Sequence, residues 1–231
     1  MSSSRTRNGS LFIHKELDYD EQFSSYPRFL TEQFSYLSGC VYSTKADAFY
    51  NVVLIGRKKD NPLVIGKVKS YTINTIYDLD AYQQEIITIC DALKVRAYIS
   101  VNYKSHKQVT LDAMVEYAND IAQDCFNNSR GIYDSAVAKF VDHSKQLWII
   151  NVDKDDSFDK SVDELTDLYI KTIESCKPYK KIVAVITTKN GKHIIAHPFD
   201  SSDFYLKIGD LVKLGSNLIK KNDMTLLYEN I

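Results

Sequence analysis

The chain has 231 residues, of which 44% are hydrophobic and 26% charged, with only four prolines and eight glycines. This composition excludes collagen-like and low-complexity architectures and predicts a compact folded protein with one composite domain or two small subdomains. Its 29 Lys and Arg residues almost balance its 30 Asp and Glu residues, which leaves a formal net charge of −1. A chain with this balance has no overall field to hold a polyanion or an anionic membrane, so any contact with nucleic acid must be local.

The cysteines are too widely spaced for a zinc knuckle or a dense disulfide framework, and we expect them to be buried as small hydrophobic residues. They are Cys40, Cys90, Cys125 and Cys176. No apolar run approaches the roughly 20 residues needed to span a bilayer, and the sequence MSSSRTRNGS at the N-terminus lacks the apolar core of a secretory signal. We therefore expect a soluble, cytoplasmic protein that contacts no membrane.

Residues 1–45 mix serines, aromatic residues and charges without a sustained period, and we interpret them as an N-terminal arm. After this arm the pattern of apolar and polar residues becomes regular. An apolar run at 49–55, a charged turn at 57–62 and an alternating segment at 64–73 follow one another. This order predicts a β-hairpin.

Apolar residues at spacings of three and four predict a helix over 77–94, which is followed by a strand over 95–103. A second helix is predicted to end at the turn cluster after Cys125. Its inward face is expected to hold Val109, Met114, Val115, Ala118, Ile121, Ala122 and Cys125. A short amphipathic segment at 132–140 completes the predicted N-terminal α/β subdomain, residues 46–140.

Helix and turn signals organise the second half of the chain. The capping box Ser161-Val162-Asp163-Glu164 begins a helix that stops before Pro178, and the Asn190-Gly191 step predicts a hairpin turn with positive φ. The predicted elements are strand 147–152, helix 161–176, strand 181–188, strand 192–198, helix 202–219 and strand 224–229. This β-α-β-β-α-β order predicts an α+β fold in which residues 141–231 form a ferredoxin-like, RRM-like unit. Its four-stranded antiparallel sheet should have the strand order 4-1-3-2.

That topology brings four polar strand ends to one edge of the sheet. Asp153 ends the first strand, Lys189 follows the second, His193 opens the third, and Asp223 leads into the fourth. Side chains alternate across a strand, so Asn151 and Asp153 should point to a face that no helix covers. Asp153 and His193 should share that face and lie within roughly 10 Å of each other. The opposite face should meet the helices through Trp148, Ile150 and Val152.

The acidic edge has two interpretations. An acidic face repels phosphate unless a divalent cation intervenes, and carboxylate oxygens are the ligands that Mg²⁺ or Mn²⁺ prefers. The alternative is that Asp153, Asp155 and Asp156 only end a strand and cap the next segment.

These residues resemble the archaeo-eukaryotic primase superfamily, which includes the primase-polymerases of phages and plasmids. Leu147-Trp148-Ile149-Ile150-Asn151-Val152-Asp153 resembles its first motif, Thr188-Lys189-Asn190-Gly191-Lys192-His193 resembles the second, and Asp223 is the best-placed third acid. The chain departs from the family at Asn151, where the first motif has an acid, unless the acidic pair is Asp153 and Asp155. The resemblance covers residues from about 49 to 229.

The resemblance implies Mg²⁺ or Mn²⁺ held by Asp153, Asp155 and Asp223, and a catalytic set of Asp153, Asp155 and His193. It also implies that Lys189, His193 and Thr188 contact a nucleoside triphosphate. Such a protein would be cytoplasmic, in a host cell if the protein is viral.

Basic residues of the first half could contact single-stranded DNA or RNA. They are Arg57, Lys58, Lys59, Arg96 and Lys104. The alternative is that Arg96 pairs locally and the charged turn is merely solvated. The sequence shows no helicase P-loop, so a helicase or other replication partner would have to act in trans.

Two functions remain open at this point. The first is a primase-polymerase-like nucleotidyltransferase that acts on nucleoside triphosphates and a nucleic-acid template with divalent metal. The second is a catalytically inactive primase-like protein of viral origin that binds nucleotides or nucleic acid. Asn151 is the residue that separates them.

Overall fold

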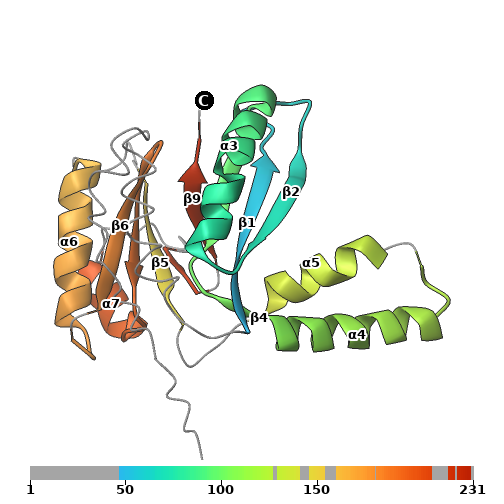
Figure 1. Cartoon of the computed structure of the whole chain (residues 1–231). Coiled ribbons are helices and arrows are strands. Elements are labelled where there is room, and N and C mark those ends of the chain that lie inside the picture. The colour runs from blue at the N-terminus through green and yellow to red at the C-terminus, as the bar shows by residue number, and fades with distance from the viewer. Residues whose placement is uncertain are drawn as a thin grey trace, which may run out of the picture.

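Figure 1 shows the computed structural model of the whole chain, which describes residues 47–126, 129–140, 146–153, 160–179, 181–209, 218–221 and 223–229. These residues form an α+β fold of five helices and two antiparallel sheets, one of five strands and one of four. The predicted N-terminal arm, Asp155 and Asp156 lie outside the described residues. Within the described part of the chain, no helix is both long and apolar enough to cross a membrane.

The first sheet has the strand order β2-β1-β3-β9, and the short strand β4 pairs with β1. The strands are β1 (Ala48–Gly56), β2 (Gly66–Ile73), β3 (Arg96–Ser100), β4 (Lys104–Ser105) and β9 (Met224–Tyr228). Helix α3 (Ile76–Leu93) covers one face of this sheet, where Leu79, Ile86 and Cys90 pack against Val52, Leu54 and Ile99. The predicted hairpin and first helix are confirmed.

Local signals set the ends of α3. The side chain of Thr75 accepts a hydrogen bond from the Asp78 backbone, and the Asp78 carboxylate accepts one from the Thr75 backbone. This capping box satisfies donors that a helix start leaves unpaired. At the other end Lys94 adopts a left-handed conformation with φ of 54°, which turns the chain directly into β3.

The second sheet has the strand order β6-β7-β5-β8. Its strands are β5 (Trp148–Asp153), β6 (Ile182–Thr188), β7 (Gly191–Ala196) and β8 (Ile219–Lys220). Helices α6 (Val162–Ser175) and α7 (Ser201–Ile208) lie on its outer face, where Trp148, Ile150 and Val152 join their buried side chains, as predicted. The predicted capping box of Ser161 and Glu164 is present at the start of α6.

The prediction for the last elements was wrong. Residues 224–229 were expected to close the second sheet, but β9 pairs with β3 of the first sheet. The fourth position of the second sheet is taken by β8, where Ile219 pairs with Ile150, although Ile219 was predicted to end a helix. Burial explains both results: Leu227 is buried in the core beneath α3, and Ile219 in the core beneath α6 and α7.

The inner face of the second sheet was predicted to be uncovered, and this too was wrong. At one end of that face Ile149, Ile186 and Ile195 pack against Val101, which follows β3. Asn102, which follows β3, links the two sheets there. Its side-chain amide donates to the Leu147 carbonyl at 3.0 Å, and its side-chain oxygen accepts from the Leu147 backbone N–H at 2.6 Å. The first sheet therefore closes over the apolar end of the face and leaves its polar end open.

Helices α4 (His106–Ala122) and α5 (Ser129–Lys139) form a helical hairpin that projects from the first sheet (Figure 1). Its base is a small core in which Phe49, Val109 and Ala113 meet Ile132, Ala136 and Val137. Most of the face predicted to point inward on α4 is exposed, and so is Cys125, whereas Cys90 and Cys176 are buried as expected.

Candidate functional site

A cleft of about 630 Å³ opens where the polar ends of the two sheets face each other. It receives residues from β1 and the turn after it, from the end of β6 and the turn after it, and from β3, β5, β7, β8 and β9. Eight of the residues singled out in the sequence line it: Arg57, Lys59, Arg96, Asp153, Thr188, Lys189, His193 and Asp223. Tertiary structure thus gathers most of the predicted site in one place.

The register of β5 against β7 places the two central groups on one face. Asn151 is directly opposite His193, and Asp153 is opposite Gly191. Residues opposite each other, and those two apart along a strand, point to the same side. Asp153 and His193 therefore share the face that lines the cleft, as predicted.

Position 191 requires glycine because the backbone of β5 lies very close to it, and not because its φ is positive. The Asn-Gly turn was predicted to need positive φ, but neither Asn190 nor Gly191 adopts it. A Cβ atom at Gly191 would instead lie 2.0 Å from the carbonyl oxygen of Val152. Glycine thus lets the turn pack directly against the end of β5, beside Asp153.

His193 connects the second sheet to the first. Its Nδ1 atom lies 3.0 Å from Oγ1 of Thr225, a buried residue of β9. Burial and the nearby charge of Lys220 lower the pKa of His193, although the carboxylates of Asp153 and Asp223 act in the opposite direction. The imidazole is thus largely neutral at pH 7, and an anion placed beside it would raise its pKa.

Two carboxylates reach the cleft from different segments. Asp153 is exposed at the end of β5 and accepts a hydrogen bond from the side-chain amide of Asn151. Asp223 lies 3.1 Å from the ammonium group of Lys220. No group of three His, Cys, Asp or Glu residues that could hold a metal ion occurs among the residues described. Asp155, the third predicted metal ligand, lies outside the described residues.

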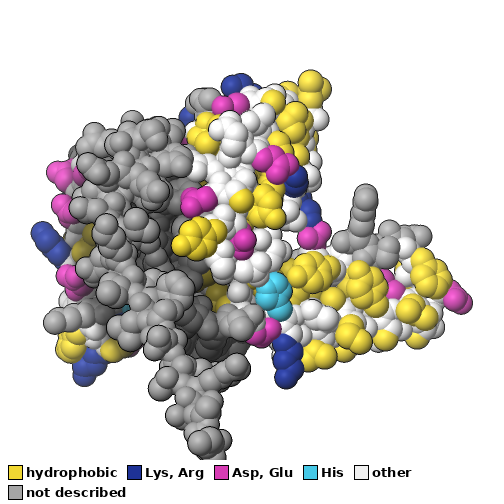
Figure 2. Space-filling view, viewed as in Figure 1, with side chains coloured by type: hydrophobic (Ala, Val, Ile, Leu, Met, Phe, Trp, Pro, Cys, Tyr) yellow, Lys and Arg dark blue, Asp and Glu magenta, His cyan; other side chains and the backbone are white. Residues whose placement is uncertain are grey.

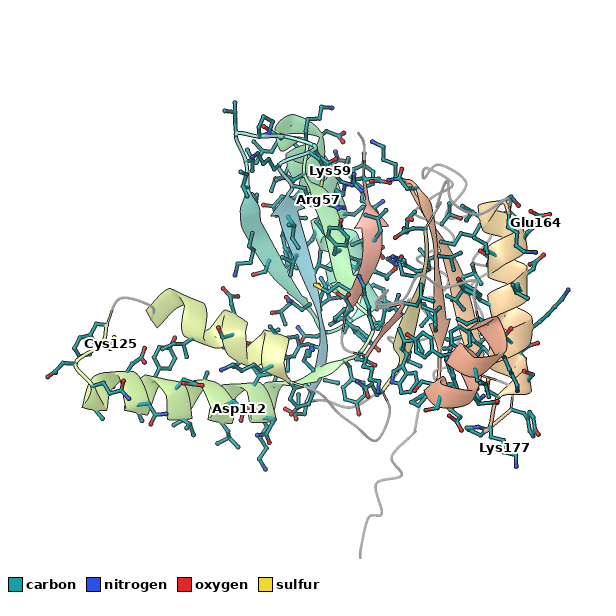
Figure 3. All side chains as sticks on the ribbon, turned by 180° about the vertical axis from the view of Figure 1, so that it is seen from behind. Arg57, Lys59, Asp112, Cys125, Glu164 and Lys177 are labelled. Carbon is teal, nitrogen blue, oxygen red and sulfur yellow. The ribbon has the colours of Figure 1, made fainter. Side chains whose placement is uncertain are left out.

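The charged turn after β1 supplies part of the cleft wall. Arg57 and Lys59 line the cleft, and Figure 3 shows both at the end of the first sheet on the side of the second. Arg57 donates a hydrogen bond to the hydroxyl of Tyr98, at 3.2 Å, which orients its guanidinium group. Lys58 is exposed on the same turn but is not among the lining residues.

The other two predicted nucleic-acid contacts are buried. Arg96 is 5% exposed and forms ion pairs with Asp60 at 2.7 Å and Glu229 at 2.8 Å. Burial disfavours its charged form, but Asp60 and Glu229 outweigh this and raise its pKa. Lys104 is also 5% exposed, donates to the carbonyl of Phe140, and has its pKa lowered by burial to about 8. Neither side chain is free to follow a nucleic-acid backbone.

The sequence reasoning missed two polar lining residues, which are Lys220 and Tyr98, the hydrogen-bond partner of Arg57. Lys220 was missed because the segment before it was predicted as helix, so the short strand β8 was not recognised. A signal for the covered inner face existed, because Ile149 lies on the same face of β5 as Asn151, Ile195 lies on the same face of β7 as His193, and Ile186 is opposite His193. A face carrying three large apolar side chains is normally buried.

Comparison with protein-family models, curated protein sequences and solved structures finds no match to this chain.

Proposed function

We propose that this chain is a primase-polymerase-like nucleotidyltransferase that binds a nucleoside triphosphate and a divalent cation in the cleft between its two sheets. In this proposal the second sheet with α6 and α7 is the ferredoxin-like, RRM-like unit that resembles the archaeo-eukaryotic primase superfamily. The order β6-β7-β5-β8 supports it, since this is the expected order 4-1-3-2 read from the other edge, with β8 as the fourth strand.

The observation that carries the proposal is the composition of the cleft. Carboxylates, an imidazole and several cations converge there from segments distant in sequence, beside the open end of the sheet. Ion pairs that only stabilise a fold do not need a cleft of about 630 Å³ around them. A cavity of this size falls within the range of small-molecule sites.

The carboxylates fit a cation that arrives together with its nucleotide. Mg²⁺ in phosphate-handling sites is held by one or two carboxylates and by substrate phosphates, not by a complete protein cage. Asp153 and Asp223 supply such a partial set. They would hold the cation, which when bound would neutralise phosphate charge and polarise the phosphoryl group.

The basic residues have a separate task. Lys189 follows β6 and Lys220 ends β8, which are the two edge strands of the second sheet. Arg57 and Lys59 lie at the facing end of the first sheet. These basic residues can therefore contact a triphosphate from two sides. His193 would donate a hydrogen bond to a phosphate oxygen, which stabilises its protonated form.

Calorimetry with Mn²⁺ and a nucleoside triphosphate tests the proposal. We expect weak binding of Mn²⁺ alone, clear binding of the metal-nucleotide complex, and at least a tenfold loss of that binding in Asp153→Ala. Asp167→Ala, the same change on the exposed outer side of α6, is the matched control and should bind like the native protein. The absence of heat with every triphosphate and with both Mg²⁺ and Mn²⁺ would refute the proposal.

A second function, binding without catalysis, is favoured by one observation. Asn151 stands where the motif has its first acid. Its side-chain amide donates a hydrogen bond to the Asp153 carboxylate and so occupies one of the two carboxylate oxygens. An amide is a weaker metal ligand than a carboxylate, and a two-metal centre needs several acids.

Primer extension on a single-stranded template separates the two functions. Extension by the native protein supports the nucleotidyltransferase, whereas extension that begins only in Asn151→Asp supports a binding protein that has lost an acid. Asn190→Asp, which adds the same charge at the cleft edge outside the strand, controls for charge alone.

A further inference from the structure

Helix α4 carries an apolar stripe with no covering element among the described residues. Leu111 is 45% exposed, Met114 and Val115 are each 61% exposed, and Ile121 is 62% exposed. Figure 2 shows hydrophobic side chains gathered along the projecting helical hairpin. Contiguous exposed apolar side chains of this kind mark interaction sites.

The stripe lies on the side of α4 that faces away from α5. Val109 and Ala113 are buried against α5, and a helix turns by about 100° per residue. On that geometry the centre of the stripe, at Ala118, lies about 180° from Val109. Helix α5 therefore cannot cover the stripe, which is exposed in the described part of the chain.

We propose that the stripe binds a second copy of this chain, with the two α4 helices antiparallel. In this arrangement Leu111 faces Ile121 of the second copy, and Met114 faces Ala118 of the second copy. The exposed small residues Ala118 and Ala122 let the helices approach and leave room for the methionine. Each apolar residue thus meets an apolar or small residue, which makes the stripe complementary to itself.

Charge selects the antiparallel direction. Lys107 lies in the first turn of α4, in line with the stripe, whereas Asp124 follows the last turn. Antiparallel pairing puts Lys107 near the negative end of the partner's helix and near Asp124 of the second copy. Parallel pairing would instead place the two Lys107 side chains together. The formal net charge of −1 adds little repulsion between copies.

This inference does not depend on the proposed function, because no stripe residue lines the cleft. Figure 3 shows Asp112 and Cys125 on the hairpin, away from Arg57 and Lys59 at the cleft. A failure of nucleotide binding would leave the pairing of the two copies intact, and a failure of that pairing would leave nucleotide binding intact.

Sedimentation equilibrium of the full chain tests the pairing. We expect the mass to rise from one copy to two with increasing protein concentration, and the double variant Met114→Asp, Val115→Asp to remain at one copy. Leu206→Asp changes an apolar residue of α7 that is 81% exposed and should pair like the native protein. A native chain that stays at one copy at every concentration overturns the inference, as does a double variant that still pairs while folded by circular dichroism.

Cross-linking tests the direction. Cys125 is exposed and follows the C-terminal end of α4, whereas Lys107 lies in its first turn. In Lys107→Cys, antiparallel pairing brings the new thiol beside Cys125 of the second copy, so mild oxidation should give covalent dimers. These dimers should be lost when Cys125→Ser is added. Equally fast dimer formation through Cys125 in the native chain would overturn the antiparallel arrangement.

Discussion

The two sheets hold their charged residues in different ways. In the first sheet Arg96 is buried between Asp60 and Glu229, so its charge is neutralised within the protein. In the second sheet Asp153 is exposed at the cleft, and its partner in the described structure is the neutral amide of Asn151. A charge paired in the interior contributes to folding, whereas a charge that keeps its contact with water remains available to a ligand.

The largest expected effect is at Arg96. Arg96→Ala leaves Asp60 and Glu229 buried without their cation, which should lower the free energy of unfolding by about 3–5 kcal/mol in urea titrations. Lys67→Ala is the control, because Lys67 pairs with Asp134 at the surface and such pairs contribute at most about 1 kcal/mol. Equal losses in the two variants would remove the distinction between interior and surface charges in the first sheet.

The next effect concerns the turn that places Asp153. Gly191→Ala puts a Cβ atom against the backbone of β5, and we expect a loss of about 1–3 kcal/mol in the same titrations. Nucleotide binding should weaken as well, because the end of β5 must shift. Gly66→Ala is not a matched control, since Gly66 has φ of 90°. Asn190→Ala, in the same turn, should change stability far less.

A smaller effect is expected where the two sheets meet, at His193. Burial lowers the pKa of His193 in the folded protein, so the unfolded chain binds a proton more readily. The contribution of His193 to stability is therefore complete above its unfolded pKa, which is near 6.5, and is lost as the pH falls below it. Denaturant titrations between pH 5 and 8 should show a weaker pH dependence in His193→Gln.

His197→Gln, which removes an exposed imidazole from the same segment, is the matched control. If His193→Gln retains the native pH dependence of stability, the group responsible lies elsewhere.

In the native protein, nucleotide binding should be accompanied by proton uptake near neutral pH, since phosphate favours the imidazolium form. Calorimetry in buffers of different ionisation enthalpy measures that uptake.

The smallest effect on stability is expected at Asp153. Asp153→Asn should change the free energy of unfolding by less than about 0.5 kcal/mol, because the side chain is exposed and supports no buried partner. Binding of the metal-nucleotide complex should nevertheless be lost. A large loss of stability would place Asp153 among the structural charges, with Arg96, and would end the contrast between the sheets.

Local sequence determined much of the fold. The capping boxes at Thr75 and Ser161 act within four residues, so the starts of α3 and α6 can be predicted without knowledge of the rest of the chain. Alternation along β5 likewise predicted that Ile150 would meet the helices and that Asp153 would face the other way. A period of two needs only the strand itself.

Tertiary structure alone decided where β9 pairs and what faces the cleft. The sequence of β9 predicts a strand, but which edge it joins depends on the apolar surfaces available, and Leu227 is buried beneath α3. The ion pairs of Arg96 reach residues 36 and more positions away, so its pattern on the strand could not distinguish a nucleic-acid contact from a structural charge. In the same way, the spacing of apolar residues on α4 predicted an amphipathic helix but not which side α5 would cover. Periodicity is a property of one segment, whereas burial depends on what the other segments bring against it.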